Sequence, residues 1–373
     1  MVQARVDGVR IAGLTAGVPD RVVRNDSLEL FSEDDRRRLI ETTGIEERRH
    51  IHPGMCTSDM CAGAAEALIA DTGVPREEIG LVVFVSQTPD YPLPATSTVL
   101  QARLGLTRNC AAFDVSLGCS GYTYGLWQAA HLLRSLDTRY ALLLVGEVGT
   151  HQVSVEDRAT AALFGDCGTA TLLEKDPDAP EMIFDLGTDG RGRDHLIIPA
   201  GQCRYPFSEA AARRRVHADG SVRADMELFM DGPQVFVFTL REVPRSLEAA
   251  RKAAGWAYTG PDAVDGIVLH QANKFMIDYI AKRCKLPTDR MKYSIERFGN
   301  TSSASLPLTL VAAMAADLAE RPCRLLLSGF GVGWSWASAA VTLGPIPAPR
   351  LIELGPEAVE APVHATLAES EAA

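Results

Sequence analysis

The stretch Asp114–Tyr122, with the sequence DVSLGCSGY, carries the strongest structural signal in this chain. Small residues flank Cys119 on both sides, directly before a segment with helical spacing that begins at Gly121. This arrangement predicts a thiol on a tight turn at a helix N-terminus. Backbone N–H groups and the helix dipole at such a place lower the pKa of a thiol and favour the nucleophilic thiolate. The alternative interpretation is a buried structural cysteine beside a tight turn.

Short apolar runs lie on both sides of this stretch, and their lack of polar alternation predicts strands covered on both faces. These runs are 81–85, 140–145, 266–269, 324–327 and 339–343. Segments with helical spacing lie between them, at 58–72, 121–136, 272–285 and 303–318. Pro233 suits the first turn of a further helix, which we expect Pro244 to kink or split. The alternation of strands and helices predicts a layered α/β protein.

The composition narrows the class of protein. Of the 373 residues, 46% are hydrophobic and 23% charged, so a packed core is expected. The net charge of −11 disfavours nucleic-acid binding, which needs a positive surface. No apolar run approaches the ~20 residues of a membrane span, and the first residues lack the apolar core of a signal peptide. None of the eight cysteines forms a CxxC pair. We therefore expect a soluble, cytoplasmic protein without a metal site, bound neither to nucleic acid nor to a membrane.

Three further motifs carry residues suited to proton transfer or to stabilising an oxyanion. His270 in LHQAN lies where an apolar strand ends and a helix begins, and strand ends are where α/β sheets place reactive groups. Asn300 in FGNTSSAS lies in a loop before another helix. Backbone N–H groups of Gly329–Trp334 (GFGVGW) are suited to an oxyanion hole. The structural alternatives are a capping role for His270, a turn role for Asn300 and a plain hairpin for the glycine-rich stretch.

In this order and spacing, the four motifs resemble the 3-oxoacyl-acyl-carrier-protein synthase III family of the thiolase superfamily. The likeness runs from about Arg10 to Leu343 and includes TTGIEER at 42–48, and DR and FGD at 157–158 and 164–166. The resemblance implies a five-layered αβαβα fold of two pseudo-symmetric halves, working as a homodimer. We expect the nucleophilic cysteine in residues 1–180 and the histidine and asparagine in residues 181–345. Residues 346–373, rich in Pro, Ala and Glu, are expected to form a disordered tail.

The resemblance also implies a ping-pong condensation. Cys119 would take an acyl group from an acyl thioester. His270 and Asn300 would hydrogen-bond the thioester carbonyl of a malonyl-type acceptor as it loses CO₂. Backbone N–H groups of Cys119 and Val332 would form the oxyanion hole, with Phe330 near the thiol. The expected partners are acyl-CoA and acyl carrier protein, and no cofactor beyond these substrates is expected.

The residues expected to bind CoA or the carrier differ from the family's pattern. Arg38 and Thr42 stand where the family places a tryptophan and an arginine against the CoA adenine. The arginine used in carrier docking is replaced by Phe275, with Lys274 beside it. Arg158, a contact on the phosphate side, is retained. These differences spare the chemistry and alter the surfaces that meet the carriers.

Two further differences fall on the substrate tunnel. Pro233 stands where the family's tunnel is lined by an asparagine. Leu93 stands where a bulky aromatic residue of one subunit enters the partner's acyl tunnel, and its smaller size suggests room for a longer or branched acyl group. We therefore expect a specialised relative, from secondary metabolism or an unusual lipid pathway, whose donor is carrier-bound or is not acetyl-CoA.

Other functions fit the same residue types. An acyltransferase would pass the acyl group from Cys119 to a hydroxyl, amine or thiol without decarboxylation. A non-catalytic partner subunit would only shape a heterodimer's tunnel, and a thiol hydrolase would release the acyl group to water. The presence of Asn300 favours condensation, because decarboxylation needs two donors to the enolate oxygen.

Overall fold

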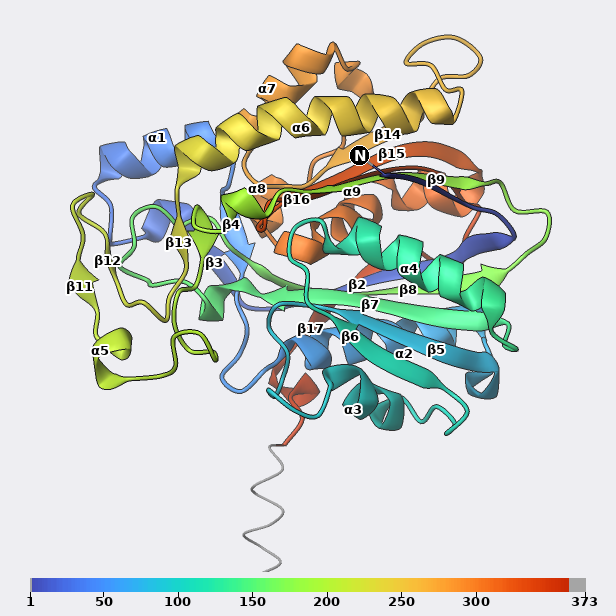
Figure 1. The fold of residues 1–373 in the computed structure, drawn as a ribbon, viewed down its shortest axis with the longest axis horizontal. Helices are drawn as coiled ribbons and strands as arrows, with labels where there is room; N and C mark the ends of the chain where they lie inside the picture. Colours follow the sequence, from blue (N-terminus) through green and yellow to red (C-terminus); the bar gives the residue numbers. More distant parts are fainter. Residues whose placement is uncertain (1, 362–373) are drawn as a thin grey trace, which may run out of the picture.

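A computed structural model describes residues 2–361 and stacks their helices and sheets in five layers, with helices outside and between two sheets (Figure 1). From one outer layer to the other, the helices are α6 (Gly232–Ala253) and α7 (Lys274–Cys284), then α4 (Gly121–Ser135) and α9 (Ser305–Glu320), then α2 (Thr57–Thr72) and α3 (Thr96–Arg103). The middle helices α4 and α9 contact strands of both sheets. The five-layered αβαβα arrangement expected from the sequence is confirmed.

The two sheets differ in strand number. The five-stranded sheet has the order β1 (Val2–Val6), β9 (Met182–Thr188), β16 (Ser335–Leu343), β15 (Cys323–Gly331), β14 (Gly266–Leu269). The six-stranded sheet has the order β17 (Arg350–Leu354), β2 (Val9–Pro19), β8 (Asp166–Lys175), β7 (Tyr140–Val148), β5 (Ile79–Val85), β6 (Ala111–Val115). In both sheets, antiparallel pairs at the centre give way to parallel pairs at the edge that carries β14 or β6.

Shorter elements complete the described chain. They are β3 (Val22–Arg24), α1 (Glu33–Thr43), β4 (Glu47–Arg49), β10 (Leu196–Ile197), α5 (Glu209–Ala212), β11 (Arg215–Val216), β12 (Val222–Arg223), β13 (Phe229–Met230) and α8 (Ile295–Phe298). A 3-10 turn, η6 (Ser302–Ala304), precedes α9.

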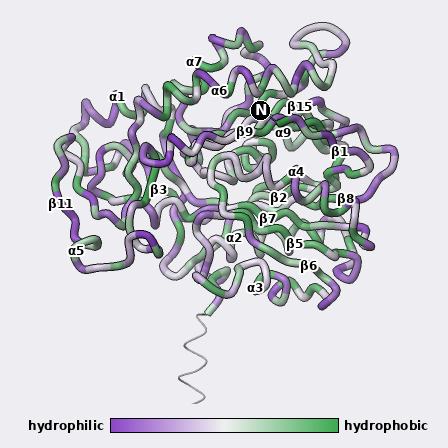
Figure 2. The backbone as a smooth tube through the Cα atoms, in the orientation of Figure 1, coloured by the Kyte–Doolittle hydropathy of each residue, from purple (hydrophilic) through white to green (hydrophobic). Residues whose placement is uncertain are grey.

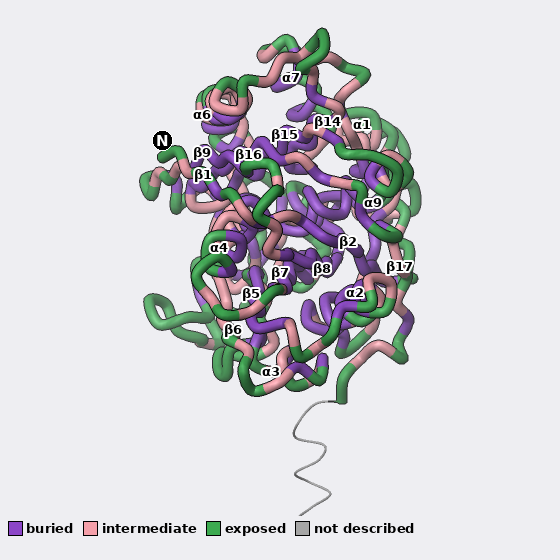
Figure 3. The backbone as a smooth tube through the Cα atoms, turned by 90° about the vertical axis from the view of Figure 1, so that its right-hand side faces the viewer, coloured by how far each residue is buried: buried purple, intermediate pink, exposed green. Residues whose placement is uncertain are grey.

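The core lies between the layers, where the apolar strands are covered on both faces. Every residue of β5 is buried, as its continuous apolar sequence predicted. Figure 2 shows that the sheet strands are among the most hydrophobic segments, and Figure 3 shows buried backbone through the centre with exposed segments at the surface. This rigid sandwich fixes the turns at the strand ends, where the motif residues lie.

Pro244 was expected to kink or split the helix after Pro233, and the split is wrong, because α6 is a single helix with Pro244 inside it. Asp231 caps the helix by accepting a hydrogen bond from the Gln234 N–H at 3.2 Å. Phe238 on the same helix is only 2% exposed. Packing of this apolar face on the five-stranded sheet therefore offsets the one hydrogen bond that the proline removes.

The expectation of a disordered tail at 346–373 is wrong for the first part of that segment. Residues 350–354 form β17, which pairs in parallel with β2, and a 3-10 turn follows at Pro356–Ala358. The Leu354 side chain packs against Gly63, where an added Cβ would lie 2.9 Å from it. The chain end therefore joins the sheet of the earlier residues, just as β1 joins the sheet of the later ones. Residues 362–373 of the expected tail lie outside the described part of the chain.

One helical segment, Ser302–Glu320, is long and apolar enough to cross a membrane by length and composition. It includes α9 of the middle layer, and 61% of its most apolar window is buried inside the protein. Its apolar character is therefore that of a core helix.

Candidate active site

Cys119 lies on the turn between β6 and α4, directly before the helix N-cap Ser120, as the sequence predicted. The residue is 7% exposed. The hairpin between β15 and β16 lies close against it, because a Cβ added to Gly331 would be 2.8 Å from the Cys119 Sγ. Glycine at position 331 is therefore needed for this approach, which brings a hairpin of one sheet against a turn of the other.

The thiol has polar neighbours but no charged partner within the described chain. Its Sγ lies 3.8 Å from the Ser302 Oγ, and the backbone of Val332 hydrogen-bonds to it. These contacts favour the thiolate, but burial raises the pKa of the thiol above its ordinary value. The lowered pKa expected from the sequence is therefore wrong, since the turn that places the thiol at the helix also removes it from water.

His270 lies at the end of β14, where its side chain enters the interior. It is 2% exposed, its Nδ1 lies 2.8 Å from the Ser305 Oγ, and the Phe330 ring meets the imidazole edge to face at 5.5 Å. Burial lowers the pKa of His270 to about 3, although a backbone hydrogen bond with Ser302 opposes that shift. The imidazole is therefore neutral near pH 7, and its contact with Ser305 leaves Nε2 for a molecule in the pocket.

Asn300 is held by hydrogen bonds of its backbone and of its side-chain oxygen. Its N–H donates to the Leu163 carbonyl at 2.8 Å, and its own carbonyl accepts from the Gly165 N–H at 3.1 Å. The side-chain Oδ1 accepts the Ser302 N–H at 2.9 Å. That bond orients the carboxamide so that the Nδ2 amide group remains to donate. Ser302 itself adopts a positive φ of 48°, a conformation uncommon outside glycine.

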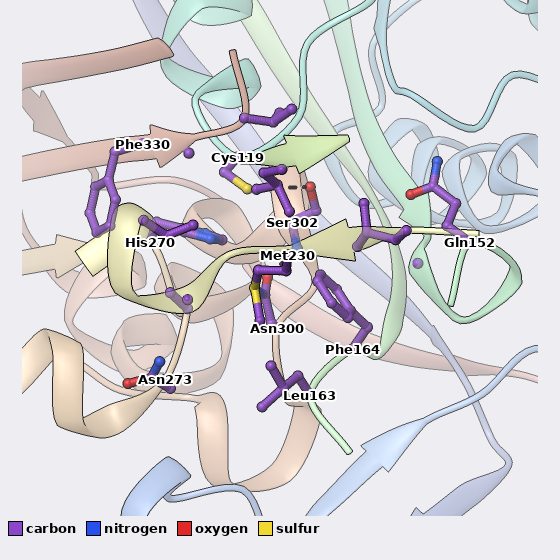
Figure 4. A pocket seen from close by; sticks show the side chains of 18 of the residues that line it. Cys119, Gln152, Leu163, Phe164, Met230, His270, Asn273, Asn300, Ser302 and Phe330 are labelled. Atoms are coloured by element: carbon purple, nitrogen blue, oxygen red, sulfur yellow. Dashed lines mark hydrogen bonds between the residues drawn. The ribbon is translucent and has the colours of Figure 1, made fainter. Parts of the chain in front are cut away.

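Cys119, His270 and Asn300 line one pocket together with Phe330 and Val332, as predicted (Figure 4). Its apolar wall consists of Leu163, Phe164, Leu196, Leu228, Met230, Val235 and Met276. Figure 4 places Gln152 and Asn273 at opposite ends of this pocket. The pocket therefore extends from Asn273 past the thiol to Gln152.

Two residues expected along the substrate tunnel lie outside this lining. Pro233 is exposed and its neighbours Gly232 and Val235 line the pocket instead, because the first turn of α6 directs position 233 outward. Leu93 is 82% exposed on the loop before α3 and borders a separate groove. Neither residue therefore shapes this chain's own pocket.

Of the expected CoA and carrier contacts, three lie on α1 and α7, and Arg158 lies on the segment before β8. Arg38 is exposed on α1, and Arg158 is bound to Asp35 of the same helix at 3.3 Å. Lys274 pairs with Asp278 at 2.5 Å. Phe275 is 53% exposed at the first turn of α7, close to where Ala272, Asn273 and Met276 line the pocket.

Sequence reasoning missed four polar neighbours of the motif residues. Ser302 and Ser305 lie inside the FGNTSSAS stretch and its helix, but nothing in that pattern distinguished them from capping residues. Gln87 and Gln152 line the pocket from loops that carried no motif. Only the tertiary arrangement brings these side chains to the site. Among residues 2–361, no group of three or more His, Cys, Asp or Glu side chains is placed to hold a metal ion.

A five-layered αβαβα fold with a thiol, an imidazole and a carboxamide in one apolar pocket defines the class of thiolase-fold condensing enzymes. Family models described as 3-oxoacyl-[acyl-carrier-protein (ACP)] synthase III, and as the C terminal of that synthase, match residues 113–190 and 256–343. The chain is 36% identical over 333 residues to a β-ketoacyl-[acyl-carrier-protein] synthase III of Roseiflexus castenholzii, with 89% of this chain and 97% of that relative covered.

Solved structures agree with these matches. A 3-oxoacyl-(acyl-carrier protein) synthase from Burkholderia xenovorans is similar with a TM-score of 0.88 and 39% identity, covering 95% of this chain and 99% of that one. A priming β-ketosynthase of a polyketide biosynthetic pathway is similar with a TM-score of 0.76 and 26% identity, covering 92% and 98%. The chain belongs to the 3-oxoacyl-[acyl-carrier-protein] synthase III family and is a condensing, acyl-transferring enzyme with the thiolase fold.

Proposed function

We propose that Cys119 is the nucleophile of a ping-pong condensation. Its Sγ attacks the carbonyl of an acyl thioester, the carrier leaves as a thiol that takes the cysteine's proton, and the acyl group remains on the enzyme. The N–H groups of Cys119 and Val332 would hold the tetrahedral oxyanion, since the Val332 backbone already reaches the thiol. Because burial raises the pKa of the thiol, we expect loading to accelerate as the pH rises.

In the second half of the proposed cycle, a malonyl-type thioester enters and loses CO₂. The electrons of the broken C–C bond form an enolate, whose oxygen accepts hydrogen bonds from His270 Nε2–H and Asn300 Nδ2–H. The enolate carbon attacks the acyl-cysteine carbonyl, and collapse of that adduct releases the 3-oxoacyl thioester and the Cys119 thiolate. A proton taken up by this thiolate restores the enzyme.

The orientation of Asn300 is the observation that carries this proposal. Its Oδ1 accepts the Ser302 N–H, and the low pKa of His270 keeps the imidazole neutral, so both side chains can donate at once. Two neutral donors suit an oxygen that gains negative charge only during reaction. An acyltransferase that does not decarboxylate its acceptor has no enolate to stabilise. It remains the alternative to be separated by experiment.

We propose that donor and acceptor carriers dock beside the Asn273 end of the pocket. Arg241, Arg245 and Arg283 line a groove between α6 and α7, and Phe275 is exposed at the first turn of α7. This positive groove lies on a chain of net charge −11, and it complements an acidic carrier protein. Arg283→Glu should lower the carrier-dependent rate and its salt sensitivity, with Arg290→Glu as the control. An unchanged salt response would count against this docking site.

We propose that the acyl group occupies the Gln152 end of the pocket. Gly149 lines this end, and a Cβ placed there would lie 3.3 Å from the Phe164 Cβ, so the glycine leaves space that a larger residue would fill. In a proposed homodimer, Leu93 of the partner subunit would close this end. Leu93→Phe should then weaken loading of long acyl groups more than short ones. Equal loading of both by the variant would argue against the assignment.

The proposed setting is a specialised pathway in the cytoplasm, with a donor that is carrier-bound or is not acetyl-CoA. The similarity to a priming β-ketosynthase supports this setting.

A panel of acyl-CoA and acyl-carrier thioesters, read by intact mass beside Cys119→Ala, would identify the donor. Malonyl-carrier is then added and CO₂ is measured. CO₂ release equal to acyl loss would support condensation. Loading followed by transfer to an alcohol, amine or thiol without CO₂ would instead identify an acyltransferase.

A further inference from the structure

Glu147 is a buried carboxyl group beside the active site that the proposed chemistry does not use. It lies near the end of β7, pairs with Cys167 of β8 and is 1% exposed. Among residues 2–361 it forms no ion pair with an arginine, lysine or histidine. A buried carboxyl group without a cation is costly unless hydrogen bonds compensate, so its partners indicate what it does.

Four donors meet at this carboxyl group, and they come from two separate parts of the chain. The loop after β5 supplies the Gln87 N–H at 3.1 Å from both oxygens, the Thr88 hydroxyl at 3.1 Å and the Ser86 hydroxyl at 3.4 Å. The turn η6 supplies the Ser303 hydroxyl, 3.1 Å from Oε1. One side chain thus ties a loop of the six-stranded sheet to the turn before α9.

Both tied segments border the thiol. Gln87 lines the pocket, and a Cβ added to Gly118 would lie 2.3 Å from its Oε1. Ser302, next to Ser303, places its Oγ 3.8 Å from the Cys119 Sγ and gives its N–H to Asn300. A shift of η6 would therefore move the neighbour of the nucleophile and release the carboxamide at the same time.

We propose that Glu147 is a positioning residue that holds η6 through Ser303, and thereby fixes Ser302 and Asn300 relative to the Cys119 thiol. This inference rests on the proposed roles of Cys119 and Asn300. It extends them to a residue whose carboxyl group has no bond to the thiol or the carboxamide in the structure, and which holds them in place through the turn.

The electrostatics agree with this geometry. Burial raises the pKa of Glu147 to about 8, and the proximity of Cys119 adds to the shift while the hydrogen bonds oppose it. The titratable groups facing it are the thiols of Cys119, of Cys61 on α2 and of Cys167 on β8. The carboxyl group is therefore mostly protonated at neutral pH, when one of its three hydroxyl partners accepts its O–H while the Gln87 N–H and the other hydroxyls donate to it. Its ionisation above about pH 8 would oppose formation of the Cys119 thiolate.

The paired variants Ser303→Ala and Ser86→Ala test the positioning role. Each removes one serine hydroxyl from the same carboxyl group, but only Ser303 belongs to η6. We expect Ser303→Ala to lower kcat for CO₂ release about tenfold, as loss of one well-oriented hydrogen bond does, with little change in KM. Ser86→Ala should stay within about twofold of native. Equal effects of the two variants, or no effect of Ser303→Ala, would overturn the proposal.

A second measurement does not depend on turnover. The rate of Cys119 alkylation by iodoacetamide between pH 6.5 and 9.5 should show an inflection near 8 in native protein, and none in Glu147→Gln. Asp185→Asn, which alters a buried carboxyl group of the other sheet, should keep the native profile. An unchanged inflection in Glu147→Gln would show that Glu147 does not couple to the thiol. A native enzyme that never loads acyl groups would instead contradict the proposed function itself.

Discussion

The two sheets contribute different groups to the pocket. The six-stranded sheet brings Cys119 on the turn after β6, its edge strand. The five-stranded sheet brings His270 at the end of β14, also an edge strand, and the Val332 backbone on the hairpin after β15. One sheet thus presents the group proposed to hold the acyl chain, and the other presents donors proposed to stabilise developing charge. A substrate lying between the sheets contacts both sets.

Asn300 joins these two regions. It follows α8, yet its backbone bonds to Leu163 and Gly165 of the loop before β8, and its side chain bonds to Ser302 of η6. We therefore propose that acyl loading depends on Cys119 and CO₂ release on His270 and Asn300, although both would occur in one pocket. Variants of His270 or Asn300 should therefore slow CO₂ release and spare acyl loading.

The largest effect should follow loss of the nucleophile. Cys119→Ala should reduce acyl loading by at least about 10³-fold, the scale typical of removing a covalent nucleophile. The matched control is Cys167→Ala, since Cys167 is fully buried on β8 and does not line the pocket. Intact mass spectrometry measures the acyl loading of both variants. Loading of Cys119→Ala at the native rate would place the acyl group on another residue.

Removal of a hydrogen-bond donor to the proposed enolate, Asn300, should have the next largest effect. Asn300→Ala should slow CO₂ release by about 10²-fold or more, as for an oxyanion-hole donor, while acyl loading stays within a few-fold of native. Asn273→Ser, which keeps a cap for α7 at the pocket's far end, is the control. Equal loss of loading and CO₂ release in Asn300→Ala would erase the division between the regions.

A smaller effect should follow a change at the contact between the regions. The added methyl group of Gly331→Ala would meet the Cys119 Sγ at 2.8 Å. Such overpacking costs about 1–3 kcal/mol, so loading should slow roughly tenfold or more while the fold survives. Gly190→Ala meets no atom within 4 Å and serves as the control. Native loading by Gly331→Ala would show that the hairpin does not need this close approach.

The smallest effect on rate concerns pH. Because the pKa of His270 is lowered to about 3, CO₂ release from preloaded enzyme should stay flat between pH 5.5 and 7.5. An inflection near 6.5 would show an ordinary histidine.

The lowered pKa of His270 also determines how stability should depend on pH. Between the folded pKa of about 3 and the ordinary 6.5, the unfolded chain binds the proton and the native chain does not. Stability should therefore fall as pH decreases across this window, and less so in His270→Gln.

The local motifs predicted most of the fold and the site, and the misses have physical reasons. Cys119 and His270 were predictable because strand ends and helix starts have local signatures. Pro244 does not split α6, because packing of the helix compensates for the lost hydrogen bond. β17 was missed because its pairing with β2 depends on residues more than 300 positions away in the chain. Glu147 carried no motif, since its role depends on four donors that only the folded chain brings together.

The most direct test measures both half-reactions in His270→Ala and in native enzyme. Each protein is loaded with an identified acyl donor, freed of excess donor and mixed with malonyl-carrier, and the acyl-enzyme mass and CO₂ are followed together. We expect His270→Ala to load acyl groups within a few-fold of native but to release CO₂ about 10²-fold more slowly. Loss of loading in parallel with CO₂ release would contradict the division of chemistry between the two sheets.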